Sequence, residues 1–188
     1  NRFIDYFKSS TEIYKGMELL DKKLGGTAPL DIVLNAPNDW SVEEEEFDDD
    51  FGFEENVDSM NGYWWNTISI SRLEEVHDYI ESLPEIGKVL SVASGIKVAR
   101  ELNDGEELSE LDLALVKNML PEDIKESLLS SYISEDENQV RISARVLESS
   151  YGLNRNELLE EISTTLEKEY GFSDQEYRLT GLAVLYNN

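Results

Sequence analysis

The chain has 188 residues, of which 41 are acidic and 16 are basic, and its formal net charge at pH 7 is −25. This charge argues against binding to nucleic acid and against docking on anionic lipid through a basic patch, so we expect neutral, cationic or hydrophobic partners. Cysteine is absent, which excludes disulfides and zinc–thiolate sites. His77 is the single histidine, which argues against a histidine metal site, and we expect neither a metal nor a cofactor.

Both ends of the chain suggest a segment of a longer protein. The sequence has no initiator Met and stops directly after an apolar stretch. It shows no signal peptide and no apolar run close to the about 18 residues that cross a bilayer. We therefore expect one domain, residues 1–188, excised from something larger.

Residues 1–26 are expected to form a connector and a helix. The spacing of apolar residues predicts a helix from Thr11 to Leu24, with Thr11 as its N-cap and Gly25 at its end. The short apolar run Leu30–Leu34 then predicts the first strand.

Residues 40–66 form an acidic and aromatic segment. From Glu43 to Asp58 there are ten acids and no base, which favours a solvated loop. A calcium site is a second interpretation, but an EF-hand loop counted from Asp48 needs Gly at its sixth and Glu at its twelfth position, where the chain has Phe53 and Ser59. A third interpretation is a mobile flap over an apolar surface, although its aromatic anchor can equally be the edge of a core. The aromatic residues of the flap and its anchor are Phe47, Phe51, Phe53, Tyr63, Trp64 and Trp65.

A second helix is predicted over residues 71–83, with Ser69 or Ser71 as its N-cap. His77 lies at the border of the apolar stripe of this helix, so we expect a half-buried or surface histidine rather than a metal ligand. The stripe consists of Leu73, Val76, Ile80 and Leu83.

The second strand is predicted at Gly87–Val92, which completes a β-α-β unit. A helical insertion over residues 95–132 comes next. Gly105 divides it, Ser109 begins its second helix, and Pro121 is well placed in the first turn of a third. The residues in register on the second helix are Leu111, Leu115 and Met119.

The third strand, Gln139–Leu147, carries the clearest pattern in the chain. Four apolar residues alternate with polar ones, which predicts one face in a core and one facing water or a polar partner. Arg141 and Arg145 on the polar face can clamp an anion or pair with surplus carboxylates of a neighbouring strand or domain. The apolar residues are Val140, Ile142, Ala144 and Val146.

The last helix and strand follow. Asn154 and Glu157 resemble a capping box at the start of a helix over 154–170. A final strand is predicted at Tyr177–Tyr186, apolar on both faces toward its end and therefore covered on both. Gly181 within it indicates a bulge or a close backbone approach.

The order of elements predicts the fold class. Strand, helix, strand, helical insertion, strand, helix and strand make an α+β fold of the ferredoxin-like split β-α-β type, with its insertion between strands 2 and 3. In that topology the third strand is central and both crossover helices cover one face. We expect the polar face of the third strand to remain available to a partner.

Catalytic motifs are missing from the sequence. There is no glycine-rich phosphate loop and no Gly-x-Ser-x-Gly elbow. Acidic pairs are so frequent here that a two-carboxylate hydrolase site has no specificity. The residues alone thus predict an α+β module that is not an enzyme.

Several stretches of the chain resemble one protein family when they are taken in order. They include Asn1–Phe7, Ser10–Met17, Leu24–Asp31, His77–Ser91, Gln139–Ser143 and Thr180–Asn188. Together they resemble an extracytoplasmic loop of RND (resistance–nodulation–division) superfamily exporters of the MmpL and Patched-like branch. The Leu-Gly-Gly-Thr-x-Pro-Leu-Asp segment resembles the loop between the seventh and eighth transmembrane helices.

This resemblance implies a periplasmic porter domain built from ferredoxin-like units. Its partners would be the protein's own transmembrane helices, a sister porter domain and a hydrophobic or lipid-like substrate, and the full-length protein can form an oligomer. Proton-driven transport in this family uses acids within the transmembrane bundle, so the chain itself would hold no proton relay. We place the substrate cleft near residues 47–65 and the sheet face that bears Arg141 and Arg145.

Two other functions stay open from the sequence. One is a membrane-anchored interaction domain that transports nothing. The other is a hydrolase that uses acidic residues, with calcium as its metal.

Overall fold

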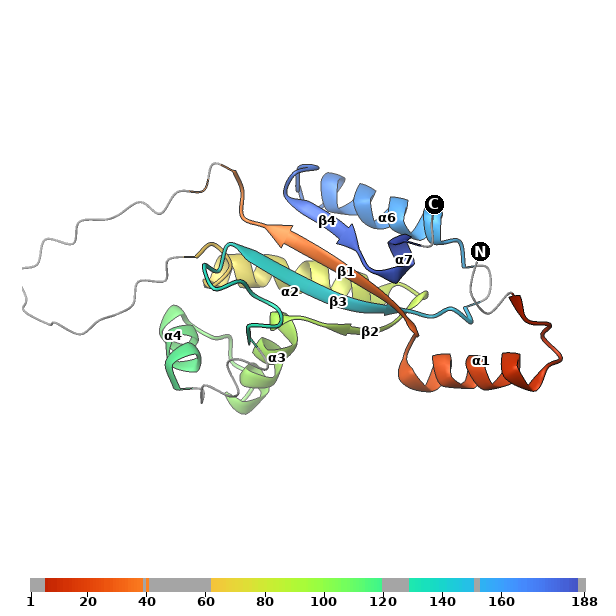
Figure 1. Ribbon diagram of the computed structural model, residues 1–188. Helices are drawn as coiled ribbons and strands as arrows, with labels where there is room; N and C mark the ends of the chain where they lie inside the picture. Colours follow the sequence, from red (N-terminus) through yellow and green to blue (C-terminus); the bar gives the residue numbers. More distant parts are fainter. Residues whose placement is uncertain (1–5, 39, 41–61, 120–128, 151–152, 186–188) are drawn as a thin grey trace, which may run out of the picture.

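A four-stranded antiparallel sheet forms the centre of the molecule. The computed structural model describes residues 6–38, 40, 62–119, 129–150 and 153–185. The strands lie in the order β2-β3-β1-β4, so the fold is α+β, as predicted (Figure 1). Their bounds are Ala28–Asn35 for β1, Ile86–Leu90 for β2, Gln139–Val146 for β3 and Tyr177–Thr180 for β4.

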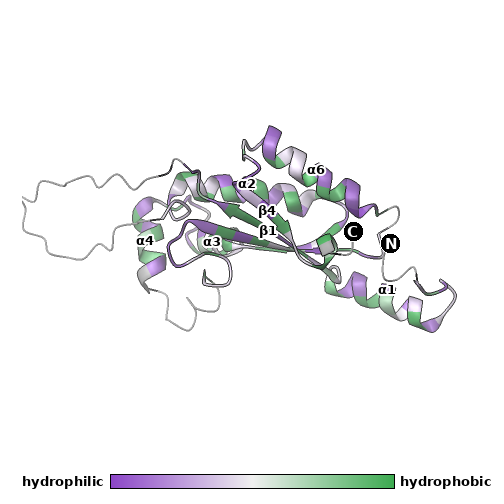
Figure 2. Cartoon of the chain, turned by 45° about the horizontal axis from the view of Figure 1, so that its top comes forward, coloured by the Kyte–Doolittle hydropathy of each residue, from purple (hydrophilic) through white to green (hydrophobic). Residues whose placement is uncertain are grey.

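Six helices are seen in the described part of the chain. Figure 2 shows α2, between β1 and β2, and α6, between β3 and β4, on the same side of the sheet. Between β2 and β3 lie α3 and α4, where the insertion was predicted. Among the described residues, none of the helices has the length and hydropathy to span a bilayer. The helices are α1 Glu12–Leu24, α2 Thr67–Ser82, α3 Val92–Leu102, α4 Glu110–Met119, α6 Arg155–Lys168 and α7 Leu182–Leu185.

The strand β3 is central, as its pattern predicted. It pairs with β2 on one side and β1 on the other. Its apolar residues are buried, whereas Arg141 and Arg145 are exposed. The core lies between this buried face and helices α2 and α6, and burying each large apolar side chain there contributes about 1.5–3 kcal/mol. Fully buried members of the core include Leu30, Ile32, Leu73, Ile80, Ile142, Ile162 and Leu166.

The helix α2 begins earlier than predicted. Its N-cap is Asn66, whose side chain accepts a 2.9 Å hydrogen bond from the Ser69 backbone N–H, and neither Ser69 nor Ser71 caps it. Asparagine is among the best capping residues, because its short side chain reaches the free N–H groups of the first turn. The two helices on the covered face contact each other through Tyr79, whose hydroxyl donates to Thr165 Oγ1 at 3.1 Å.

The second strand is shorter than predicted, since Val92 already belongs to α3. Ser91 ends the strand and caps this helix: its Oγ accepts from the Ala93 N–H at 3.1 Å, and Ser94 Oγ accepts from the Ser91 N–H at 3.2 Å. The reciprocal pair makes a capping box, so the helical insertion starts near residue 92 and not at 95.

The predicted strand Tyr177–Tyr186 is wrong beyond Thr180. The strand β4 has four residues, Gly181 has φ 108°, and α7 follows. A Cβ at Gly181 would lie 2.5 Å from the Pro29 carbonyl oxygen, which confirms the predicted close backbone approach. Because β4 is an edge strand with exposed Arg178 and Thr180, it is not covered on both faces.

The helix α1 forms between Thr11 and Gly25 as predicted, but it extends beyond the sheet (Figure 1). Asp21, which is 1% exposed, holds its C-terminal end: it accepts hydrogen bonds from Thr27 Oγ1 at 2.6 Å and from the Ser149 N–H at 2.7 Å. Burial raises the pKa of Asp21, but these hydrogen bonds outweigh burial and the pKa lies below its ordinary value. The apolar residues that α1 exposes include Ile13, Leu19, Leu20 and Leu24.

Candidate functional site, an apolar pocket beside a basic sheet face

The sheet face opposite α2 and α6 carries four basic residues, which we call the basic face: Lys88, Arg141, Arg145 and Arg178. Directly paired residues of antiparallel strands point to the same side. Arg145 pairs with Lys88, and Arg141 and Arg178 both pair with Val33. A chain with a net charge of −25 thus gathers positive charge on one surface.

The basic face is poor in acidic residues. Asp31, paired with Ser143 and Thr180, is the only acid in the four strands. Within the described ranges, the ion pairs engage other bases and none involves the basic face. The predicted pairing of Arg141 and Arg145 with surplus carboxylates is therefore not formed among these residues.

A pocket of about 740 Å³ adjoins the basic face. It is lined by residues of α3, of α4 and of the segment that enters β3. Figure 1 labels the two helices. Its surface is almost entirely apolar, which is typical of sites for hydrophobic small molecules. The apolar side chains that line it include Trp65, Leu90, Val98, Leu102, Leu108, Leu115, Val116 and Leu129.

The side chains of α3 explain why the pocket is open on this side. Ile96 points into the core, whereas Val98 and Leu102 are exposed on the other side of the helix. Gly95 also lines the pocket, and a Cβ at this position would meet no atom within 4 Å. The missing side chain leaves the pocket open along this wall.

The opposite wall, α4, is held against the body by three hydrogen bonds. Glu110 accepts from the Thr67 N–H at 2.8 Å and from Thr67 Oγ1 at 2.6 Å. Trp65 Nε1 donates to the Leu113 carbonyl at 3.3 Å. These contacts hold α4 against the start of α2, and so position the second wall of the pocket.

Three polar side chains of the pocket wall, Ser91, Ser94 and Asp112, are already hydrogen-bonded to nearby groups of the chain. The Ser91 and Ser94 hydroxyls accept hydrogen bonds from backbone N–H groups at the start of α3. Asp112 accepts from the Ser109 N–H at 2.8 Å and from Ser109 Oγ at 2.7 Å, and these bonds lower its pKa. The pocket therefore favours an apolar occupant.

Two residues join the pocket to the basic face. Leu90 lines the pocket and pairs with Ser143, which stands between Arg141 and Arg145 on β3. Tyr132 also lines the pocket, and the Arg141 guanidinium lies 5.7 Å from the centroid of its ring. Positive charge thus stands at one margin of an apolar site.

The structure separates the aromatic candidates. Trp65, 1% exposed, lies on the pocket wall, whereas Trp64 is a core residue whose ring stacks on Phe172 with the centroids 6.4 Å apart. Tyr63 is half-buried and its hydroxyl accepts from Arg72 at 3.0 Å. Phe47, Phe51 and Phe53, together with the acidic loop for which calcium was a second interpretation, lie outside the described residues.

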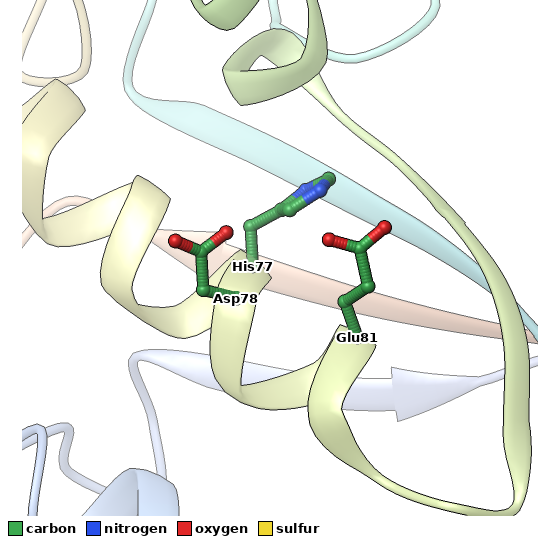
Figure 3. A group of neighbouring side chains, drawn as sticks. All are labelled: His77, Asp78 and Glu81. Carbon is green, nitrogen blue, oxygen red and sulfur yellow. The ribbon is translucent and has the colours of Figure 1, made fainter.

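Another cluster, on α2, consists of His77, Asp78 and Glu81, which offer ligand atoms within 4.8 Å of one another (Figure 3). Lys97 hydrogen-bonds Asp78 and lies 3.9 Å from Glu81, so one ammonium already pairs with both carboxylates. His77 is 2% exposed, with Nδ1 2.8 Å from Ser91 Oγ, so the predicted half-buried or surface position is wrong. Burial, and then Lys97, lower the pKa of His77, which favours a neutral structural histidine.

The pocket was missed at the sequence level, although two signals point to it. The helix α3 carries apolar residues beyond its buried face, since Val98 and Leu102 are 56% and 84% exposed, and Gly95 lies nearby on the helix. Leu111 and Leu115 of α4 were expected to be in register on one face of the helix, and they are 69% and 45% exposed; Leu115 lines the pocket. Apolar side chains that the core does not bury often line a ligand-binding groove.

No protein-family model and no curated protein matches the chain.

Proposed function

We propose that the chain is a periplasmic porter domain of a proton-driven RND-type exporter and forms part of the pathway of a hydrophobic or lipid-like substrate. The observation that carries this proposal is the apolar pocket of about 740 Å³ between α3 and α4. Its size falls within the range of about 300–1,000 Å³ that is usual for small-molecule sites. The domain acts by binding and passing on its ligand, without catalysis.

The strand order supports the same proposal. The order β2-β3-β1-β4, with α2 and α6 on one face, is the order of a ferredoxin-like split β-α-β unit. The family that the sequence resembles builds its porter domains from such units. In this arrangement the uncovered face of the sheet is free to meet the sister domain or the substrate, and the transmembrane helices of the same protein would supply the driving force.

A first test measures ligand binding. The 188-residue chain is titrated with an uncharged long-chain alcohol, dodecanol, below its solubility limit, by isothermal titration calorimetry. We expect saturable binding with a negative heat-capacity change, because apolar surface is buried. The variant Gly95→Leu places a side chain in the pocket and should weaken binding, whereas Gly16→Leu, on α1 and equally free of neighbours, should not.

A second test examines the gene on either side of residues 1 and 188. The transport proposal requires flanking apolar helices of about 20 residues each. A flanking sequence without such helices would remove it.

The exposed apolar residues of α1 favour a second candidate, a membrane-anchored interaction domain. Ile13, Leu20 and Leu24 are each at least half exposed, which is typical of a helix that packs on another protein. A single flanking membrane anchor, in place of a bundle, would select this candidate.

A further inference from the structure

We propose that the pocket and the basic face together bind one amphiphile with a single anionic head group. Its alkyl chain lies in the pocket, and its head group lies against Arg141, Arg145 and Lys88. This inference rests on the proposed function and names the chemical class of its substrate. It also replaces the expectation, drawn from the net charge, that partners are neutral, cationic or hydrophobic.

Continuity between the two surfaces is the first argument. Leu90 belongs to the pocket wall and to the open side of β2, where it pairs with Ser143. Arg141 and Arg145 flank Ser143 on the same side of β3, and Lys88 pairs with Arg145. A ligand that leaves the pocket past Leu90 therefore meets three cations.

Charge is the second argument. Exposed charges farther apart than the Debye length of about 8 Å at physiological ionic strength are largely screened, so the nearest groups decide the local preference. On the strands beside the pocket these groups are the three cations and Asp31. On the helical side of the pocket Asp112 is bound to Ser109, and Glu107 is paired with Arg100. Two further acids, Glu101 and Asp104, stand next to lining residues along the chain. The distant acids that set the net charge do not cancel this local field.

The chemistry of arginine is the third argument. A guanidinium is weakly hydrated and presents a planar fork of donors that matches a carboxylate or phosphate. Arg141 is oriented by the ring of Tyr132, 5.7 Å away, which itself lines the pocket. A cationic head group would be repelled here, and an uncharged one would gain no charge-assisted hydrogen bond.

The test compares three ligands of equal chain length on the 188-residue chain by calorimetry: dodecanoate and dodecylamine below their micellar concentrations, and dodecanol below its solubility limit. We expect dodecanoate to bind about tenfold more tightly than dodecanol, the effect of one charge-assisted hydrogen bond, and dodecylamine to bind most weakly. In the double variant Arg141→Gln/Arg145→Gln, dodecanoate should fall to the affinity of dodecanol. Lys168→Gln, which removes a cation from α6, should leave the preference intact.

The pocket variant separates the two parts of the ligand. Gly95→Leu should weaken dodecanoate and dodecanol alike, since both place the same chain in the pocket. A Cβ at Gly95 would meet no atom within 4 Å and the residue has no positive φ, so the backbone accepts a side chain there. Urea unfolding of Gly95→Leu checks that the variant is folded.

Four outcomes would overturn the inference. Equal affinity for dodecanoate and dodecanol would rule out a preference for an anionic head group, but it would leave the proposed function standing. Dodecanoate binding that Gly95→Leu does not weaken places the ligand outside the pocket. Binding only to anionic vesicles indicates a membrane surface in place of a single amphiphile. Absence of binding by all three ligands removes the proposed function as well.

Discussion

The two faces of β3 share one backbone but differ in burial and in charge. Val140, Ile142, Ala144 and Val146 are at most 1% exposed beneath α2 and α6, whereas Arg141 and Arg145 on the other face are exposed. Both crossover helices lie on the same side, so the sheet has one face for the core and one for a partner (Figure 2). Substitutions on the two faces should therefore separate stability from binding.

The largest effect is expected on the covered face. Ile142→Ala removes a fully buried side chain and leaves a cavity, and it should destabilise the protein by about 2–5 kcal/mol in urea unfolding. Arg141→Gln, one residue away on the open face, should stay within about 0.5 kcal/mol of the parent. Similar losses for both variants would mean that the two faces do not differ as described.

A smaller loss is expected where the chain enters β1 against β3. Gly26 has φ 102°, and a Cβ there would lie 2.8 Å from the carbonyl oxygens of Arg145 and Val146. Gly26→Ala should therefore cost about 1–3 kcal/mol. Its control, Gly16→Ala, lies within a helix and should gain about 0.5–1 kcal/mol. A neutral Gly26→Ala in thermal or urea unfolding would show that this end of β3 is loosely packed.

A loss of about 1 kcal/mol is expected when the N-cap of α2, a helix of the covered face, is removed. Asn66→Ala removes the bond to the Ser69 N–H and should cost about 1 kcal/mol in urea unfolding. Ser71→Ala, at an exposed position that was one of the predicted caps, should have almost no effect. A larger loss of stability for Ser71→Ala than for Asn66→Ala would instead support the predicted cap and the later start of the helix.

The smallest effect is a pH dependence on the covered side. The pKa of His77 is lowered below 6.5 in the folded protein, so folding favours the neutral ring. Its contribution to stability is fully present above pH 6.5 and is lost as the pH falls toward the lowered value. His77→Gln should flatten the fall of stability below pH 6.5 in urea titrations, and an unchanged slope would contradict a buried neutral histidine. Asp21, whose pKa is also lowered, starts to lose its contribution only near pH 3.8.

The sequence predicted the parts of the fold that depend on short-range patterns. Period-two alternation identified β3, and helical spacing identified α1, α2 and α6. Local chemistry also contained the true cap of α2, Asn66, but Ser69 and Ser71 are equally good capping residues, so residue type alone does not decide where the helix begins. The end of β4 was missed because an apolar run such as Leu182–Leu185 is compatible with strand and helix alike.

The candidate site depends on long-range placement and was predicted only in part. Arg141 and Arg145 were found from their spacing on one strand. Lys88 joins them through the register of β2 with β3, which no local pattern reveals. Net charge sums over all positions, so a value of −25 concealed a basic face.

One measurement tests the division between the two faces most directly. Stability in urea and affinity for dodecanoate are determined for Arg141→Gln/Arg145→Gln alongside the parent chain. We expect stability to remain within about 0.5 kcal/mol and the dissociation constant to rise about tenfold. Unchanged affinity, or a loss of stability comparable to that of Ile142→Ala, would contradict a sheet with one face for folding and the other for binding.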